Sequence, residues 1–170
     1  MIEFDIEGPF EIPFAQERGG RICHWKEFWQ QQDVIDAGIE KAKGVYVFAW
    51  RAGKGYKPWY VGSATKTFGQ EALSDRNRRI YLEVMAQYQK GTPVLFFVIH
   101  PTQRGPTNKK TISEIEEFLI GYSARANPDL KNVQGNRASK WSINGLLRSS
   151  KGKPTSAATK FKQCVGAGRI

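Results

Sequence analysis

The chain has 170 residues, of which 40% are hydrophobic and 12% aromatic, so it is expected to form one globular domain and not a disordered segment. Its formal net charge of +10 favours a polyanionic partner such as nucleic acid, because Lys and Arg that neutralise phosphates release counterions. The longest apolar run, Val94 to Ile99, is far too short to span a membrane, and the N-terminus is acidic where a signal peptide is positively charged. We therefore expect a cytoplasmic protein with no membrane partner; the sequence does not indicate its oligomeric state.

The first 43 residues predict an extended arm followed by short helices. Apolar residues alternate with polar ones between positions 4 and 14, and Pro9 and Pro13 disfavour a helix. Residues 25–29 and 34–39 indicate one or two short helices whose apolar side chains cover a sheet. We expect residues 1–43 to pack as an arm and short helices on the core that follows.

The next segment predicts a hairpin. Residues 44–50 are β-branched and aromatic, residues 52–55 read Ala-Gly-Lys-Gly, and residues 58–62 are again typical of a strand. Because the connection is short, antiparallel pairing is the expected arrangement.

Two helices and a third strand follow the hairpin. A helical pattern runs from 69 to 89, an unbroken apolar strand from 94 to 99, and a second helix from 111 to 126. The apolar strand is expected at the centre of the sheet or next to it. The predicted fold class is α+β, with a small three-stranded antiparallel sheet flanked by helices.

Residues 133–170 predict a basic extension of the same domain, with an apolar island at 141–147 and a short helix at 155–165. Cations interleaved with aromatic residues suit docking on a phosphate backbone, and a solvated tail is the alternative. The predicted basic C-terminal stretch comprises Lys131, Arg137, Lys140, Arg148, Lys151, Lys153, Lys160 and Lys162.

The order of these features resembles the GIY-YIG nuclease family. Gly44-Val45-Tyr46 is followed, after thirteen residues, by Tyr60-Val61-Gly62, then by a helix with arginines and a helix with glutamates. The resemblance covers residues 44–132 and implies a GIY-YIG-like nuclease core acting on DNA. It further implies that one carboxylate holds one Mg²⁺ or Mn²⁺, an arginine neutralises the phosphate, and tyrosines orient or deprotonate the attacking water.

The two tyrosines match the family positions and, on neighbouring strands, are expected to face one cleft. Either Tyr46 or Tyr60 would then be the general base, although tyrosines in a strand are also common as core aromatics. Gly62 is expected to let a phosphate or backbone come close. Ser63 stands where the family commonly has a hydroxyl or a lysine, and a turn-capping role is the alternative.

The predicted metal ligand is Glu116, chosen from Glu114, Glu116 and Glu117. On a helical wheel only Glu116 lies at the border of the apolar face, where a metal would stabilise a half-buried carboxylate. The family pattern of Glu, two residues and an apolar pair also falls on Glu116. A capping box of Ser113 with Glu116 is the alternative, and one of Thr111 with Glu114 would free Glu116.

The predicted phosphate clamp is Arg76, with Arg78 and Arg79 as alternatives. Residues 67–71 look like an insertion relative to the family, and Arg76 lies at the margin of the apolar helix face. Arg79 precedes an apolar residue, as the family arginine does, and is expected to contact substrate. Asn132 resembles the asparagine that closes the family motif and tethers the loop below the site, with an Asx turn as the alternative.

Two other functions remain open on sequence grounds. One is a non-catalytic nucleic-acid-binding module that keeps the fold, which the insertion and the ambiguous arginine would favour. The other is a protein-interaction domain in which Trp25, Phe28 and Trp29 form a partner surface.

Overall fold

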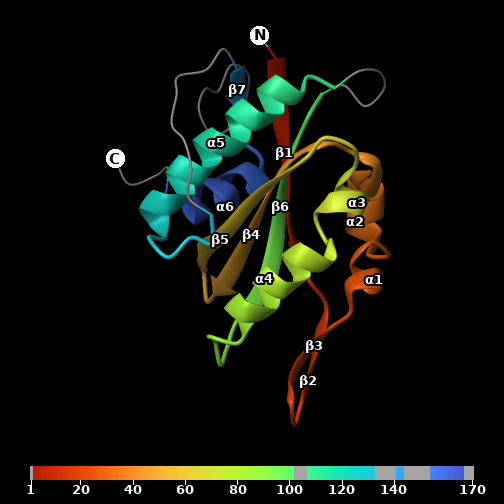
Figure 1. Cartoon of the computed structure of the whole chain (residues 1–170), viewed down its shortest axis with the longest axis vertical. Helices are drawn as coiled ribbons and strands as arrows, with labels where there is room; N and C mark the ends of the chain where they lie inside the picture. Colours follow the sequence, from red (N-terminus) through yellow and green to blue (C-terminus); the bar gives the residue numbers. More distant parts are fainter. Residues whose placement is uncertain (1, 102–106, 133–140, 144–153, 167–170) are drawn as a thin grey trace.

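The main sheet has five strands in the order β5-β4-β6-β1-β7, and the computed structural model describes residues 2–101, 107–132, 141–143 and 154–166 (Figure 1). Neighbours among β5, β4, β6 and β1 are antiparallel, whereas the short β7 runs parallel to β1. The strands are β1 (Ile2–Glu11), β4 (Gly44–Ala52), β5 (Gly55–Ala64), β6 (Thr92–Ile99) and β7 (Trp141–Ile143). A separate hairpin of β2 (Phe14–Glu17) and β3 (Gly20–Cys23) projects from one end of the molecule.

Both faces of the sheet are buried, because side chains alternate along each strand and are apolar on both sides. In β4, Val45 and Val47 enter one core, while Tyr46, Phe48 and Trp50 enter the other. The core on the valine side contains α5 (Lys109–Ala126) and α6 (Ser156–Cys164).

The core on the tyrosine side is covered by five short elements. These are α1 (Trp25–Phe28), α2 (Gln32–Asp36), the 3₁₀ turn η1 (Ile39–Lys41), α3 (Phe68–Glu71) and α4 (Asp75–Met85). Within the described parts of the chain, no helix combines the length and apolar character that a membrane span needs.

Several expectations are confirmed. The fold is mixed α and β, β4 and β5 form the predicted antiparallel hairpin, and β6 lies at the centre of the sheet. The second predicted helix appears as α5 and the terminal one as α6.

The predicted three-stranded sheet and separate N-terminal arm are wrong. Residues Ile2–Glu11 form β1, which pairs with β6 inside the sheet. Phe4 and Ile6 enter the core under α5, whereas Phe10 enters the opposite core, because the register shifts between Glu7 and Phe10. The alternation was read correctly as extended, but the pairing partner lies about ninety residues away and leaves no local pattern.

The single helix predicted over 69–89 is also wrong, since two helices occupy this stretch. The first, α3, starts after Thr67, whose side chain accepts a hydrogen bond from the backbone N–H of Gln70 at 3.3 Å. Ser74 takes the N-cap position of α4 with extended backbone angles. Ser and Thr favour helix starts over helix interiors, and here they divide one periodic segment into two.

The aromatic cluster proposed as a partner surface packs inward. Phe28 is fully buried and Trp29 meets its ring edge-on at 4.9 Å, while Trp25 lies 6.4 Å from the ring of Tyr81. Trp25 and Trp29 are only partly exposed, so the cluster belongs to the core on the tyrosine side.

Candidate active site

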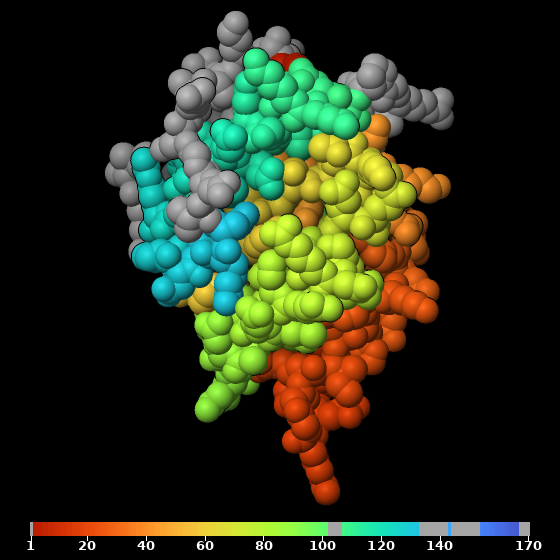
Figure 2. Space-filling view, viewed as in Figure 1, coloured from red at the N-terminus to blue at the C-terminus, as the bar shows by residue number. Residues whose placement is uncertain are grey.

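A cavity of about 290 Å³ opens at the edge of β5, between α5 and the α3–α4 segment. In Figure 2 the strand β5 reaches the surface between these helices. Nine residues line the cavity: Tyr46, Tyr60, Ser63, Gln70, Glu71, Ser74, Arg76, Asn77 and Glu116. Five of them were site candidates from the sequence, namely Tyr46, Tyr60, Ser63, Arg76 and Glu116.

The two tyrosines form the floor of this cavity. In the β4–β5 register Tyr46 is opposite Gly62 and Tyr60 is opposite Phe48, which places both rings on the same face of the sheet. Their ring centres are 6.3 Å apart, and both side chains are almost fully buried. The expectation that they face one cleft is confirmed.

Asn77 orients the hydroxyl of Tyr46. Its Nδ2 donates to Tyr46 Oη at 2.7 Å and to the backbone carbonyl of Glu71 at 2.8 Å. Because a carbonyl oxygen only accepts, the second bond identifies this atom as the amide nitrogen. Tyr46 Oη is therefore an acceptor toward Asn77, which leaves its own proton free to point toward another acceptor.

The electrostatic surroundings distinguish the two tyrosines. Burial raises the pKa of Tyr46 far above its ordinary value, and the neighbouring Tyr60 adds to this. Burial also raises the pKa of Tyr60, but the charge of Arg76 and the hydrogen bond from Tyr46 oppose the rise. Because Asn77 also donates a hydrogen bond to Tyr46, the group that distinguishes the two is Arg76, whose charge favours the ionised form of Tyr60 only.

Gly62 has a different role from the predicted one. A Cβ at this position would overlap Cζ and Oη of Tyr46. The Tyr46 phenol is therefore one group that requires a glycine here. Gly62 does not line the cavity, and its predicted contact with substrate stays a prediction.

The side chain of Glu116 reaches the cavity from α5, whereas the two tyrosines reach it from β4 and β5. The helix starts at Lys109, and the N-cap is Asn108, whose side chain accepts from Thr111 N at 3.2 Å. Both predicted capping boxes are therefore wrong, because the helix begins earlier than either would require. Glu116 lies two turns inside α5, half-buried and free of a capping role.

Ser63 bonds to this carboxylate and does not cap a turn: its Oγ donates to Glu116 Oε2 at 2.8 Å. Burial raises the pKa of Glu116 above its ordinary value. The Ser63 hydrogen bond opposes the rise, and the negative charges of Glu117 and Glu71 add to it. A carboxylate in such surroundings is stabilised by any cation placed beside it.

Glu71 is a second carboxylate of the cavity that the sequence reasoning missed. It comes from α3, inside the segment that looked like an insertion, together with Gln70. Phe68 anchors this short helix, because its ring packs edge-on against Tyr46 at 6.2 Å and against Phe97 at 4.7 Å. The departure from the family spacing was the only signal that residues 67–71 build part of the site.

The donor set fits a divalent cation that is held partly by substrate. Mg²⁺ commonly takes one or two carboxylates and completes its shell with waters and phosphate oxygens. Glu116 and Glu71 supply two carboxylates to one cavity. No group of three or more His, Cys, Asp or Glu suited to a metal occurs in the described residues, so an all-protein metal cage is not what this site offers.

Of the three candidate arginines, only Arg76 lines the cavity. Arg78 Nη1 lies 3.5 Å from Asp75 Oδ1, and Arg78 Cζ lies 5.7 Å from the centre of the Trp25 ring. Arg79 is exposed and lies outside the cavity lining, so its predicted contact with substrate stays a prediction.

Asn132 tethers the chain after α5 to the open edge of β5. Its Oδ1 accepts from the backbone N–H of Val61 at 3.1 Å, and its Nδ2 donates to the Val61 carbonyl. Lys131 N donates to Trp59 O at 2.9 Å, which continues the pairing. The predicted tether is present, whereas contact of Asn132 with substrate stays a prediction because the residue lies outside the cavity lining.

Much of the predicted basic extension lies outside the described residues, namely Arg137, Lys140, Arg148, Lys151 and Lys153.

Comparison of the chain with protein-family models, with curated proteins and with solved structures found no match.

Proposed function

We propose that this chain is a metal-dependent endonuclease that hydrolyses DNA phosphodiester bonds in the cavity between α5 and α3–α4. The observation that carries the proposal is that Glu116, Arg76 and Tyr60 come from three separate elements and line one cavity. Phosphodiester hydrolysis needs a nucleophile, charge neutralisation at phosphorus and support for the leaving oxygen. The cavity has a side chain suited to each requirement.

Arg76 is proposed as the phosphate clamp. It is the one arginine of the cavity lining, and its charge reaches Tyr60. A guanidinium donates to phosphate oxygens in a fixed planar geometry and stays charged at every relevant pH. A phosphate beside Arg76 would therefore lie next to the Tyr60 hydroxyl.

Tyr60 is proposed as the group that orients and deprotonates the attacking water. The charge of Arg76 favours the phenolate form of Tyr60, and a phenolate can accept the proton of the attacking water. Tyr46, whose pKa burial raises further, is the supporting hydroxyl.

Glu116 is proposed as the ligand of one Mg²⁺ or Mn²⁺ ion, with Glu71 on the same cavity lining. When bound, such an ion supplies positive charge that neutralises the phosphate and stabilises the leaving oxygen. Ser63 holds one oxygen of the Glu116 carboxylate and so fixes its orientation.

The test is cleavage of labelled single-stranded, duplex and branched DNA by the wild-type protein and by Glu116→Ala, with Mg²⁺, Mn²⁺ or EDTA. We expect cleavage that requires the metal and falls by about 10³-fold or more in the variant, the loss typical of removing a principal electrostatic group. Glu117→Ala, the neighbouring carboxylate outside the cavity lining, is the matched control and should retain activity.

Thermal unfolding of the variants shows whether a loss of activity reflects a loss of fold. A folded wild-type protein that leaves all these substrates intact with both metals would contradict the proposal. If it nevertheless binds DNA in a salt-dependent manner, the chain is the non-catalytic binding module.

A further inference from the structure

A second cavity lies away from the candidate active site. It has a volume of about 600 Å³ and is formed by the β4–β5 hairpin, the C-terminal end of α5 and the C-terminal end of α6. We call it the α5–α6 cavity. Its lining comprises Lys54, Gly55, Tyr56, Lys57, Tyr122, Arg125, Ala126, Gln163, Cys164, Val165 and Gly166.

The two cavities differ in charge. The candidate active site is lined by Glu71, Glu116 and one cation, Arg76, so it does not by itself attract a polyanion. The α5–α6 cavity is lined by Lys54, Lys57 and Arg125, and none of its lining residues, all within the described chain, is acidic. A nuclease with this active site needs phosphate contacts elsewhere, and this cavity supplies three unopposed charges.

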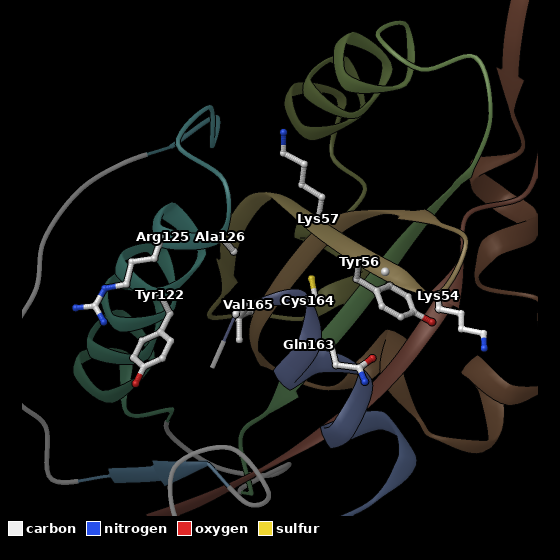
Figure 3. Close-up of a pocket in the computed structure, with 11 residues that line it drawn as sticks. Lys54, Tyr56, Lys57, Tyr122, Arg125, Ala126, Gln163, Cys164 and Val165 are labelled. Atoms are coloured by element: carbon white, nitrogen blue, oxygen red, sulfur yellow. The ribbon is translucent and has the colours of Figure 1, made fainter. Parts of the chain in front are cut away.

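Lys54 and Arg125 lie on two sides of the cavity, whereas the side chain of Lys57 extends from the β5 rim toward the opposite face of the sheet. Figure 3 shows Tyr122 and Arg125 on one side, Lys54 and Tyr56 on the other, and the charged ends extending outward. Lys57 Nζ lies 4.7 Å from the centre of the Trp59 ring. Across the described residues, none of the three cations has a carboxylate within ion-pair distance. Separated, unpaired charges suit successive phosphates better than one small anion.

The interior of the cavity offers aromatic surface. Tyr56 and Tyr122 are half-buried, and Cys164 and Val165 lie between them, as Figure 3 shows. Tyr56 packs edge-on against Phe96 at 5.5 Å, so its ring is held in place. Fixed aromatic rings beside cations are the surface on which unpaired bases stack, whatever their sequence.

We propose that the α5–α6 cavity binds a single-stranded segment of the nucleic-acid substrate, with phosphates on Lys54 and Arg125, a further phosphate on Lys57 at the β5 rim, and an unpaired base against the ring of Tyr56 or Tyr122. The inference rests on the proposed function for its choice of nucleic acid, but not on turnover. Part of this proposed binding surface lies outside residues 44–132, because α6 forms one wall of the cavity.

The spacing along α5 sets a lower limit for the length of the substrate. Glu116 and Arg125 are nine residues apart on this helix, which corresponds to about 14 Å along its axis. Nine residues also turn the helix by about half a circle, so the two cavities flank α5 on different sides. A strand that reaches both cavities must therefore extend at least this distance beyond the cleaved bond.

The test measures binding of fluorescent single-stranded oligonucleotides of increasing length to the Glu116→Gln protein, which is expected not to cleave them. In this background Lys54, Lys57 and Arg125 are all changed to Gln. We expect about 10- to 100-fold weaker binding and a smaller slope of log K against log salt, by about two for three phosphate contacts on single strands.

The matched control removes the same number of charges elsewhere, by changing the exposed Lys26, Lys41 and Lys90 to Gln. The control should bind nearly as tightly as the parent.

Photo-cross-linking of a 5-iododeoxyuridine oligonucleotide gives an independent readout that does not depend on charge. Cross-links to Tyr56 or Tyr122 are expected. Equal binding by both triple variants, or cross-links only to other residues, would overturn the inference even if the protein cleaves DNA. Conversely, binding and cross-linking at this cavity by a protein that never cleaves DNA would reject the proposed function and leave this inference standing.

Discussion

Tyr46 and Tyr60 lie on adjacent strands, face the same cavity and still differ in what they can do. Asn77, which is buried with 4% of its surface exposed, donates a hydrogen bond to the hydroxyl of Tyr46. Tyr60 instead lies within reach of the charge of Arg76. A nearby cation favours the ionised form, which is why we propose Tyr60 and not Tyr46 as the base.

The selection predicts unequal effects of two otherwise identical substitutions. Tyr60→Phe should lower the cleavage rate by about 10²- to 10⁴-fold, the range for loss of a general base, whereas Tyr46→Phe should lower it much less. Because burial raises the pKa of Tyr60 and the base must be deprotonated, the wild-type rate should rise with pH on the alkaline side of neutrality. Rates measured across pH check both points.

The rate of Tyr46→Phe should keep that rise, since Tyr60 is still present. A larger loss in Tyr46→Phe than in Tyr60→Phe would exchange the two roles. A rate independent of pH over the alkaline range in the wild-type protein would argue against a tyrosine base.

At this scale the sequence indicated the right residue types but not their connections. Tyr46, Tyr60, Arg76 and Glu116 were found from motif spacing and helix periodicity. Asn77 and Glu71 were not, because a polar residue on or before a helix carries no local sign that its partner is a tyrosine on a distant strand. Such contacts arise only when α3 and α4 pack on the sheet.

The strand β5 forms one edge of the main sheet, so only one of its sides pairs with another strand of that sheet. An open edge presents unpaired backbone groups to other chains. Here the segment after α5 covers it: the side chain of Asn127 donates to Pro58 O at 2.7 Å, Lys131 N donates to Trp59 O, and Asn132 pairs with Val61. These bonds fix the part of β5 that carries Tyr60.

Asn132→Ala should therefore destabilise the protein by about 2 kcal/mol, because it leaves the Val61 N–H and carbonyl without their partner. Chemical denaturation measures the change in the free energy of unfolding. Asp129→Ala, an exposed position in the same segment, is the control and should change it by less than about 0.5 kcal/mol. Equal stability of both variants would show that the tether is not maintained in solution.

Element boundaries were predictable where the signal was local. The hairpin was found from its strand residues and short turn, and β4 and β5 meet at Gly53 and Lys54 as expected. The break between α3 and α4 was missed, since periodic apolar residues continue through it and the capping tendencies of Thr67 and Ser74 were outweighed in the prediction.

For the molecule as a whole, one sheet with helices on both faces brings distant segments into a single site. The tyrosines come from the hairpin at its edge, Arg76 from a helix on one face and Glu116 from a helix on the other. The α+β class followed from composition and periodicity. The five-stranded sheet did not, because β1 pairs with β6 and with β7, both of which lie far from it in the sequence.

The central claim is that Glu116 holds a catalytic metal beside Tyr60 and Arg76. A crystal of the protein soaked in Mn²⁺ and examined by anomalous diffraction tests it most directly, with Glu116→Gln treated identically. We expect one strong peak at the Glu116 carboxylate, inside the cavity, that disappears in the variant. A wild-type crystal with Mn²⁺ bound elsewhere, and with Glu116 still bonded only to Ser63, would contradict the account.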